Sequence, residues 1–346
     1  MRRIRTQGFG LVAVLAVAGL LQAAEDLTSI TGEQGVHVMP LPRKAAAKAA
    51  EREAMGLVSQ GSGTPALSYH GGPVMTSVTT YAIFWAPAKL QNGASTSLPA
   101  SYQNIQTALL QLYPGHGIDN NNTQYYMKTG SGLFTFTSYI QNVGSFGGSY
   151  IDTSAYPSSG CYDSVTPGNC LSDAQIQAEV QKVMALKGWT GGLNHMFFVY
   201  TASGEGSCAS FGCAYTDYCA YHGYFNQGTT PVIYGNMPYA AAGYCQAGTS
   251  PNGDPAGDAA ASVTSHELTE AITDPLLNAW YSAAGDEIGD LCAWNYGTNT
   301  YASATANERW PISYSNIFLI GHPPITSFEL QQEYDNHTAG CVQVGP

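Results

Sequence analysis

Eight cysteines constrain the fold of this chain more than any other feature of its sequence. Their number is even and all lie beyond residue 160, so cross-links would hold only the second part of the chain. Their positions are compatible with two local disulfides, Cys161–Cys170 and Cys208–Cys213, and with one near the C-terminus, Cys292–Cys341. A zinc site built from thiolates is the alternative, but no two cysteines have the Cys-x-x-Cys spacing typical of such sites.

The start of the chain has the pattern of an export signal. Three early arginines precede an apolar run at 11–21, and the residues at 22–24 suit a cleavage site. An uncleaved membrane anchor is the alternative, but this apolar core is short for spanning a bilayer. We therefore expect residues 1–24 to be a signal peptide and the mature protein to be secreted and extracellular, with no membrane association after cleavage. Outside the cell, the even cysteine count favours up to four disulfides.

Residues 25–60 differ in composition from the rest of the chain. The stretch 42–55 is rich in alanine with alternating charges, which predicts a short solvated helix. We interpret 25–60 as a leader or pro-segment, and a disordered linker is an equally good interpretation. Residues 61–346 contain no obvious break, so we expect a single domain there.

The charges are unevenly distributed. Residues 1–54 hold seven of the 12 Lys and Arg but only five of the 24 Asp and Glu, so the remainder has a net charge of −14. So few cations argue against nucleic acid or an anionic membrane as a partner.

Strand and helix patterns alternate through the first two hundred residues. Apolar or alternating runs predict strands at 79–85, 133–140, 195–201 and 232–234. Helical spacing and capping signals predict helices at 101–113, 172–186 and 258–272. The Gly-, Tyr- and Cys-rich region 202–256 is expected to be mostly loops. The prediction is an α/β or α+β fold, a single mixed-sheet domain with a zincin-like active-site helix and disulfide-stapled loops.

The helix expected at 258–272 carries the residues best suited to chemistry. His266 and Glu270 are four residues apart, so one helical face would present both to one ion. Glu267 points about 100° round the helix, which suits contact with a metal-bound water. The pattern is that of His-Glu-x-x-His metalloproteases, with glutamate in place of the second histidine. A solvated helix would explain the motif alone, but the preceding residues are small and neutral, as in a helix packed inside a domain.

A second acidic cluster follows at 286–290. Glu287 lies 21 residues after His266. Thermolysin-like enzymes have a third ligand glutamate at a similar distance, followed by an aspartate that orients a ligand histidine. Glu287 and Asp290 are therefore candidate metal-site residues, and a solvated acidic turn is the alternative.

One histidine, two carboxylates and a water would make a four-coordinate site, for which zinc is the first expectation and manganese or calcium is possible. Glu267 would act as the general base. The candidate donors for stabilising an oxyanion are Tyr281, Tyr221, Tyr224 and His222. His222 is also a candidate ligand, although a histidine hydrogen-bonded in a loop is the more frequent case.

Scattered motifs between 68 and 345 resemble the secreted Exordium or phosphate-induced protein family, known mainly from plants and with bacterial relatives. The matching pieces lie at 68–75, 84–85, 219–223, 237–240, 250–254, 270–275 and 278–281, with Cys292 and Cys341. The resemblance implies an extracellular or wall-associated protein. The plant pattern lacks the His-Glu pair, so the metal site rests on this sequence's own residues.

Two classes of function follow from the sequence. The first is a secreted metal-dependent peptidase, with zinc as the expected metal, acting on a protein or peptide substrate. The second is a non-catalytic extracellular or wall-associated protein, which would bind cell-wall carbohydrate through tyrosine-rich loops. In the second case the metal would be structural or the site vestigial.

Overall fold

The computed structural model describes residues 36–54, 66–240, 245–246, 249–297, 325 and 327–345. The expected signal peptide at 1–24 therefore lies outside the described residues. Among the residues that are described, no helix combines the length and apolar character needed to cross a membrane.

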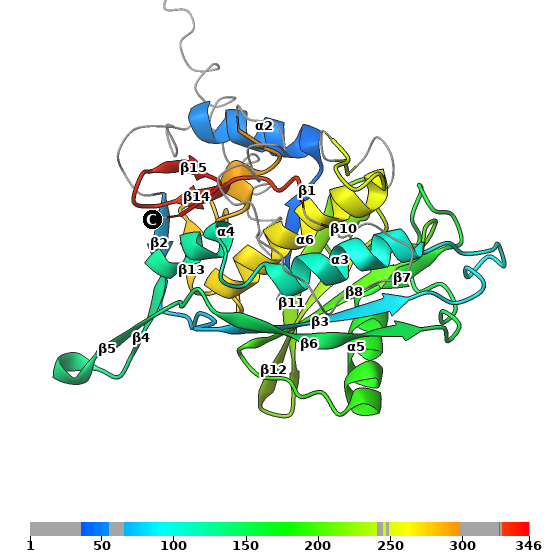
Figure 1. Ribbon diagram of the computed structural model, residues 1–346, viewed down its shortest axis with the longest axis horizontal. Helices are drawn as coiled ribbons and strands as arrows, with labels where there is room; N and C mark the ends of the chain where they lie inside the picture. Colours follow the sequence, from blue (N-terminus) through cyan, green and yellow to red (C-terminus); the bar gives the residue numbers. More distant parts are fainter. Residues whose placement is uncertain are drawn as a thin grey trace, which may run out of the picture.

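A six-stranded mixed sheet forms the centre of the fold (Figure 1). Its strand order is β1-β11-β12-β8-β3-β6. Strands β12, β8, β3 and β6 run parallel to one another, whereas β11 pairs antiparallel with both β1 and β12. The strands are β1 Val36–Pro40, β11 Tyr218–Gln227, β12 Thr230–Met237, β8 His195–Thr201, β3 Val78–Trp85 and β6 Gly144–Asp152. The central strands β3 and β8 are the buried apolar runs that the sequence predicts, because a central parallel strand is covered on both faces.

Helices cover both faces of this sheet (Figure 1). On one face lie α3 Ala100–Leu112 and α6 Pro255–Thr273, and on the other lies α5 Asp173–Lys187. The predicted capping box of α5 is present, formed by Ser172 and Gln175. This arrangement confirms the predicted mixed-sheet α/β class.

Helix α6 packs closely against α3. Its first turn begins at the cap Asp254, whose side chain accepts a hydrogen bond from the Gly257 backbone N–H. A Cβ atom at Gly257 would lie 2.8 Å from Ile105 Cδ1 and 3.2 Å from Tyr102 Cα, so only glycine permits this approach. Every residue of α6 from Gly257 to Thr273 is buried, as its run of small side chains predicts.

Two predictions for secondary structure were wrong. The region 202–256 contains β11, β12, β9 Gly206–Ala209 and β10 Gly212–Cys213 rather than mostly loops, because its aromatic residues favour strands and β11 pairs with β1 and β12. The helix expected to be solvated is α2 Pro42–Ala54, yet Lys48 and Arg52 on it are buried. Both cations point at acidic partners that the local pattern does not reveal.

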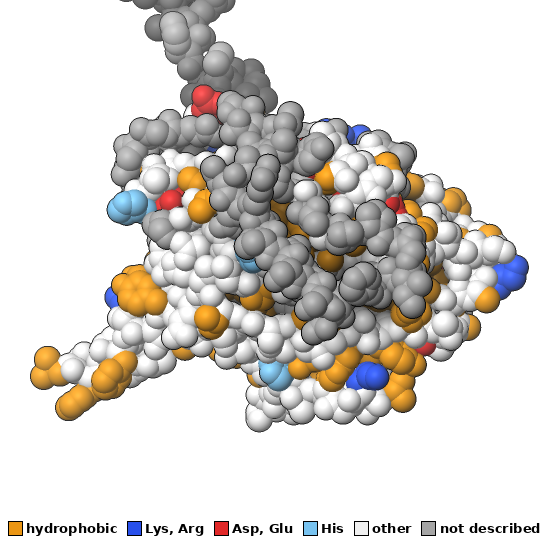
Figure 2. All heavy atoms as spheres, viewed as in Figure 1, with side chains coloured by type: hydrophobic (Ala, Val, Ile, Leu, Met, Phe, Trp, Pro, Cys, Tyr) orange, Lys and Arg blue, Asp and Glu red, His pale blue; other side chains and the backbone are white. Residues whose placement is uncertain are grey.

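The hairpin of β4 Tyr126–Thr129 and β5 Phe136–Tyr139 projects from the body of the molecule (Figure 1). Its tip carries apolar side chains, visible in Figure 2, and Leu133 is fully exposed. The strand predicted at 133–140 is thus partly a 3-10 turn, Gly132–Phe134, followed by β5.

Short elements complete the fold around the ends of α6 and the last disulfide. They are β2 Leu67–Tyr69, α4 Gly117–Asn120, the 3-10 turn Asn121–Gln124, β7 Cys170–Ser172, β13 Trp280–Ser282, the 3-10 turn Asp290–Cys292, β14 Glu333–Asp335 and β15 Gly340–Val342.

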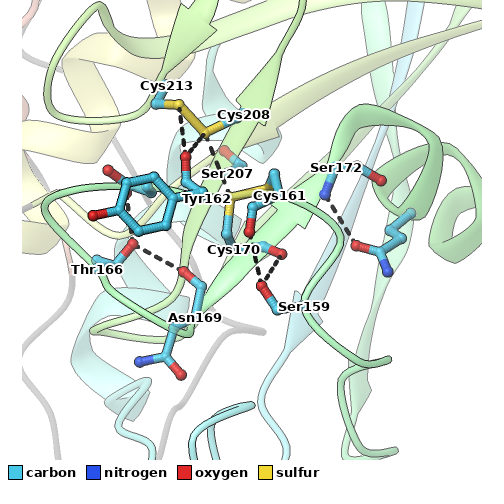
Figure 3. The surroundings of a disulfide bond; sticks show 12 residues. Ser159, Cys161, Tyr162, Thr166, Asn169, Cys170, Ser172, Ser207, Cys208 and Cys213 are labelled. Atoms are coloured by element: carbon cyan, nitrogen blue, oxygen red, sulfur yellow. Dashed lines mark hydrogen bonds between the residues drawn. A yellow bond between two sulfur atoms is a disulfide. The ribbon is translucent and has the colours of Figure 1, made fainter.

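All eight cysteines are paired, and the three expected disulfides are confirmed. The fourth, Cys219–Cys245, ties β11 to the segment before α6. Figure 3 shows two of the disulfides side by side, where Cys170 Sγ lies 3.4 Å from Cys208 Sγ. The predicted stapling of this half of the molecule is therefore correct.

Candidate metal centre

Helix α6 brings its three predicted residues into the interior. His266, Glu267 and Glu270 are each fully buried. His266 Nε2 lies 3.1 Å from Glu270 Oε1, as expected for side chains one helical turn apart. Charged groups of this kind are costly to bury without partners, so the identity of those partners defines the site.

The turn after β13 supplies the second acidic cluster. Glu287 and Asp290 are buried, and the Asp290 backbone N–H donates a hydrogen bond to Glu270 Oε1 at 3.0 Å. Gly289 between them passes close to the helix, because a Cβ there would lie 2.6 Å from His266 Nδ1 and 2.9 Å from Glu270 Oε1. The disulfide from Cys292 fixes the end of this turn.

Strand β11 contributes His222, which lies in a strand rather than in the expected loop. Its Nδ1 is 3.0 Å from Glu267 Oε2, and its Nε2 is 3.8 Å from Glu287 Oε2. No described residue is a hydrogen-bond partner of Nε2. Burial lowers the pKa of His222 well below 6.5, reinforced by His37 and His266. A neutral imidazole that donates from Nδ1 to a carboxylate presents a lone pair on Nε2, as metal-binding histidines do.

His37 is a site residue that sequence reasoning missed. It lies on β1, where strand pairing sets it opposite His222. Its Nε2 is 2.6 Å from Asp290 Oδ2 and its Nδ1 is 3.3 Å from Glu287 Oε1. Burial opposes its charged form, but Asp290 and Glu270 outweigh that effect and raise its pKa. A single histidine in a leader-like stretch gives no local signal of this role.

Two cations from α2 also reach the acidic turn. Lys48 Nζ lies 2.6 Å from Asp286 Oδ1, and Arg52 donates to the same oxygen at 2.9 Å. Burial opposes ionisation of Asp290, yet Lys48 and His37 lower its pKa well below the usual range. Segment 36–54 therefore provides cations to a cluster that is otherwise strongly acidic.

Three carboxyl groups in and beside the cluster have raised pKa values, in contrast to Asp290. Burial raises the pKa values of Glu267, Glu287 and Glu333 well above 4.5, and nearby carboxylates add to the effect. Glu333 lies on β14, and a hydrogen bond from the Gln331 side chain only partly offsets the effect of burial on its pKa. It is a second residue that the sequence pattern did not single out.

Gln331 determines which nitrogen of His266 is free. Its amide oxygen accepts from the Trp294 backbone N–H, and its Nε2 donates to the Gly289 carbonyl and to His266 Nδ1. Because this amide donates to Nδ1, a proton on the His266 ring lies on Nε2, facing Glu270. His266 would bind an ion through Nε2 only if this amide turned over, whereas His222 is already oriented to do so.

The cluster contains the kinds of ligand atom that bind a divalent cation, namely imidazole nitrogens and carboxylate oxygens. Among the described residues, two groups without cysteine have ligand atoms within 4.8 Å of one another, and both contain Glu270. They are His222, Glu267, Glu270 and His37, Glu270, Asp290. Within the described part of the chain, five buried ligand atoms have no hydrogen-bond partner: His222 Nε2, His266 Nε2, Glu270 Oε2, Glu287 Oε2 and Asp290 Oδ1. A third group consists of Cys161, Cys170 and Cys208, all of which form disulfides.

The candidate oxyanion donors are less favourably placed. Tyr221 neighbours His222 on β11 and so points to the other face, where its hydroxyl donates to Asp173. The ring of Tyr281 stacks on His70, and no contact joins its hydroxyl to the acidic cluster within the described part of the chain. Tyr224 shares the His222 face of the strand without a polar contact to the cluster.

Comparison with known proteins finds two plant relatives. The chain is 43% identical over 70 residues to protein EXORDIUM-like 5 of Arabidopsis thaliana, which covers 18% of this chain and 19% of that protein. It is 41% identical over 73 residues to EXORDIUM-like 3 of the same plant, covering 19% and 22%. The chain thus spans about a fifth of the length of the curated relatives it matches. No protein-family model and no solved structure matches it. These matches support the resemblance to Exordium-like proteins.

Proposed function

We propose that this protein is a secreted, zinc-dependent peptidase whose metal is held by His222, Glu270 and Glu287. The observation that carries the proposal is the meeting of buried, unpartnered nitrogen and carboxylate atoms around Glu270. Structural ion pairs alone would leave fewer such atoms without partners. Export is supported by four disulfides, which persist in oxidising compartments.

The donor atoms favour zinc over calcium. Calcium takes six to eight oxygen ligands, whereas imidazole nitrogens suit zinc. Among the described residues, His222 Nε2 has no hydrogen-bond partner, and it lies 3.8 Å from Glu287 Oε2. A bound zinc ion would supply Lewis-acid polarisation of a carbonyl and lower the pKa of a water.

Glu267 has the position and environment of a proton acceptor. Its Oε2 faces His222 Nδ1, and its Oε1 accepts from the Met39 backbone N–H at 3.3 Å. Burial and the neighbouring Glu270 raise the pKa of Glu267, which makes its carboxylate a stronger proton acceptor, as a general base must be. Its two contacts also hold His222 in the tautomer with a free Nε2.

The Glu267→Gln variant tests this proposal. We expect metal analysis of the purified wild-type protein to find one zinc per chain. We expect the variant to keep its fold and lose about 10²–10⁴-fold in kcat/KM on unfolded protein substrates. The matched control is Glu205→Gln, which changes a buried glutamate outside the cluster and should keep its activity. Active protein without zinc, or full activity in Glu267→Gln, would contradict the proposal.

A non-catalytic role is the second candidate, and one observation favours it. The ligand atoms are enclosed, and β1 covers the β11 edge beside them, so a substrate has no direct path to the cluster in this arrangement. Such a protein would act in the extracellular matrix or wall, with any metal serving stability. A chelator would then lower the melting temperature of the protein, with no hydrolysis detectable before or after metal removal.

A further inference from the structure

The first relevant feature is the position of β1 on the sheet. Residues Val36–Pro40 pair antiparallel with β11, the strand that carries His222. All five residues of β1 are buried. Without β1, the edge of β11 beside the acidic cluster would present unpaired N–H and C=O groups, as edge strands that bind extended peptides do.

The second feature is how segment 36–54 neutralises the cluster. His37, Lys48 and Arg52 are 3%, 5% and 4% exposed, although each is a polar or charged residue. All three face acidic partners in the turn at 286–290. Removing one side of a buried ion pair leaves an uncompensated charge, so the cluster needs another cation wherever this segment is absent.

The third feature is that the segment contacts carboxyl groups that the proposed site also uses. The two ring nitrogens of His37 contact oxygens of Glu287 and Asp290. The Met39 backbone N–H occupies Glu267 Oε1. A metal ion bound by the carboxyl groups of this cluster would therefore compete with the cations of the segment for the same negative charge.

We propose that residues 36–54 are a built-in blocking segment, which covers the peptide-binding edge of β11 and competes with a divalent cation for the carboxylates of the site. The proposal rests on the proposed metal site and extends it to regulation. It also assigns a binding mode to the substrate, an extended peptide running antiparallel to β11 in the place of β1. Segment and metal-loaded site are two alternative states, each supplying positive charge to the same cluster.

The alternative is that His37 is a permanent metal ligand. The blocking segment and the permanent ligand predict opposite effects of zinc on amide exchange at 36–54. Hydrogen–deuterium exchange of the full-length, metal-free protein, followed by mass spectrometry, measures the response. If the segment competes, saturating zinc should speed amide exchange at 36–40 and in α2 by about tenfold, while α6 keeps its protection. Unchanged or slower exchange at 36–54 on zinc addition would overturn the proposal.

Zinc affinity measured by calorimetry provides a second test. His37→Ala in the full-length chain should bind zinc about tenfold more tightly if His37 is a competitor, and more weakly if it is a ligand. The double variant Lys48→Ala/Arg52→Ala should also bind more tightly. The matched control is Arg43→Ala, which removes a charge from the exposed face of α2 and should leave zinc affinity unchanged.

These measurements separate the blocking segment from the peptidase activity. Exchange and calorimetry require no catalysis, so zinc-driven release of 36–54 without any proteolysis would support the segment and reject the peptidase. Zinc-dependent proteolysis with 36–54 still protected would support the peptidase and reject the segment. Equal zinc affinity in wild type, His37→Ala and the double variant would also reject the segment.

Discussion

Glu270 connects the parts of the chain that meet at the acidic cluster. Its Oε1 contacts His266 and the Asp290 backbone N–H, and its Oε2 lies 3.7 Å from His222 Nδ1. Helical periodicity alone predicts the first of these contacts. The other two depend on a turn 20 residues away and on a strand 48 residues away, which local pattern cannot place together.

Asp119 offers a test of buried electrostatics away from this cluster. Burial raises its pKa to about 7, against the effect of donors from the Gly115 backbone and the Asn122 side chain. The folded state therefore holds this proton more tightly than the unfolded chain, where the pKa is 3.8. The stabilisation is complete below pH 3.8 and is lost as pH rises to about 7.

Replacing Asp119 by Asn should remove the loss of folding stability that this carboxyl group causes as pH rises. Chemical denaturation at pH 4.5 and 7.5 measures the free energy of unfolding of each protein. We expect wild type to lose about 2–4 kcal/mol more than Asp119→Asn over this interval. Glu51→Gln, at an exposed position, is the control and should behave like wild type. Parallel pH profiles for wild type and Asp119→Asn would count against a raised pKa.

At the level of elements, the α3–α6 contact positions the helix that carries the site. Gly257→Ala should lower the free energy of unfolding by about 1–3 kcal/mol, although alanine favours a helix, because its Cβ meets Ile105 Cδ1 and the Tyr102 backbone. Thermal and chemical unfolding measure the change. Ile105→Val removes the nearer of these atoms, so the double variant should recover part of the loss. Additive losses in the double variant would show that the predicted clash is absent.

Elements with a strong local pattern were predictable, and elements defined by their partners were not. The buried strands β3 and β8 and the helices α3, α5 and α6 follow from apolar runs and periodicity. Strand β11 was not predictable, because its glycine and tyrosine content resembles that of loops and its pairing with β12 and β1 is not local.

The same distinction applies to the candidate site. His266, Glu267 and Glu270 were predictable as one group, since a single helix presents them. His37 was not predictable, because its contact with Asp290 spans 253 residues and depends on β1 joining the sheet. Lys48 and Arg52 were likewise assigned to solvent, since an alternating charge pattern contains no information about distant carboxylates.

For the whole molecule, the disulfides differ in what they hold together. Cys292–Cys341 closes 49 residues and ends the turn that carries Glu287, whereas Cys161–Cys170 closes nine residues on another part of the fold. Chain-entropy arguments give about 4 kcal/mol for the longer loop and about 3 kcal/mol for the shorter one. Comparable losses of stability are therefore expected when either is removed.

Zinc affinity should distinguish the roles of these two disulfides. Replacing both Cys292 and Cys341 by serine should weaken zinc binding by about tenfold or more, because the acidic turn loses the covalent tie that positions it against α6. Replacing Cys161 and Cys170 should lower the melting temperature and leave zinc affinity within about twofold, since sites with no shared partners act independently. Calorimetric zinc titration well below both melting temperatures makes the comparison. Equal zinc affinities in the two variants would mean that the helix and the sheet alone hold the acidic turn in place.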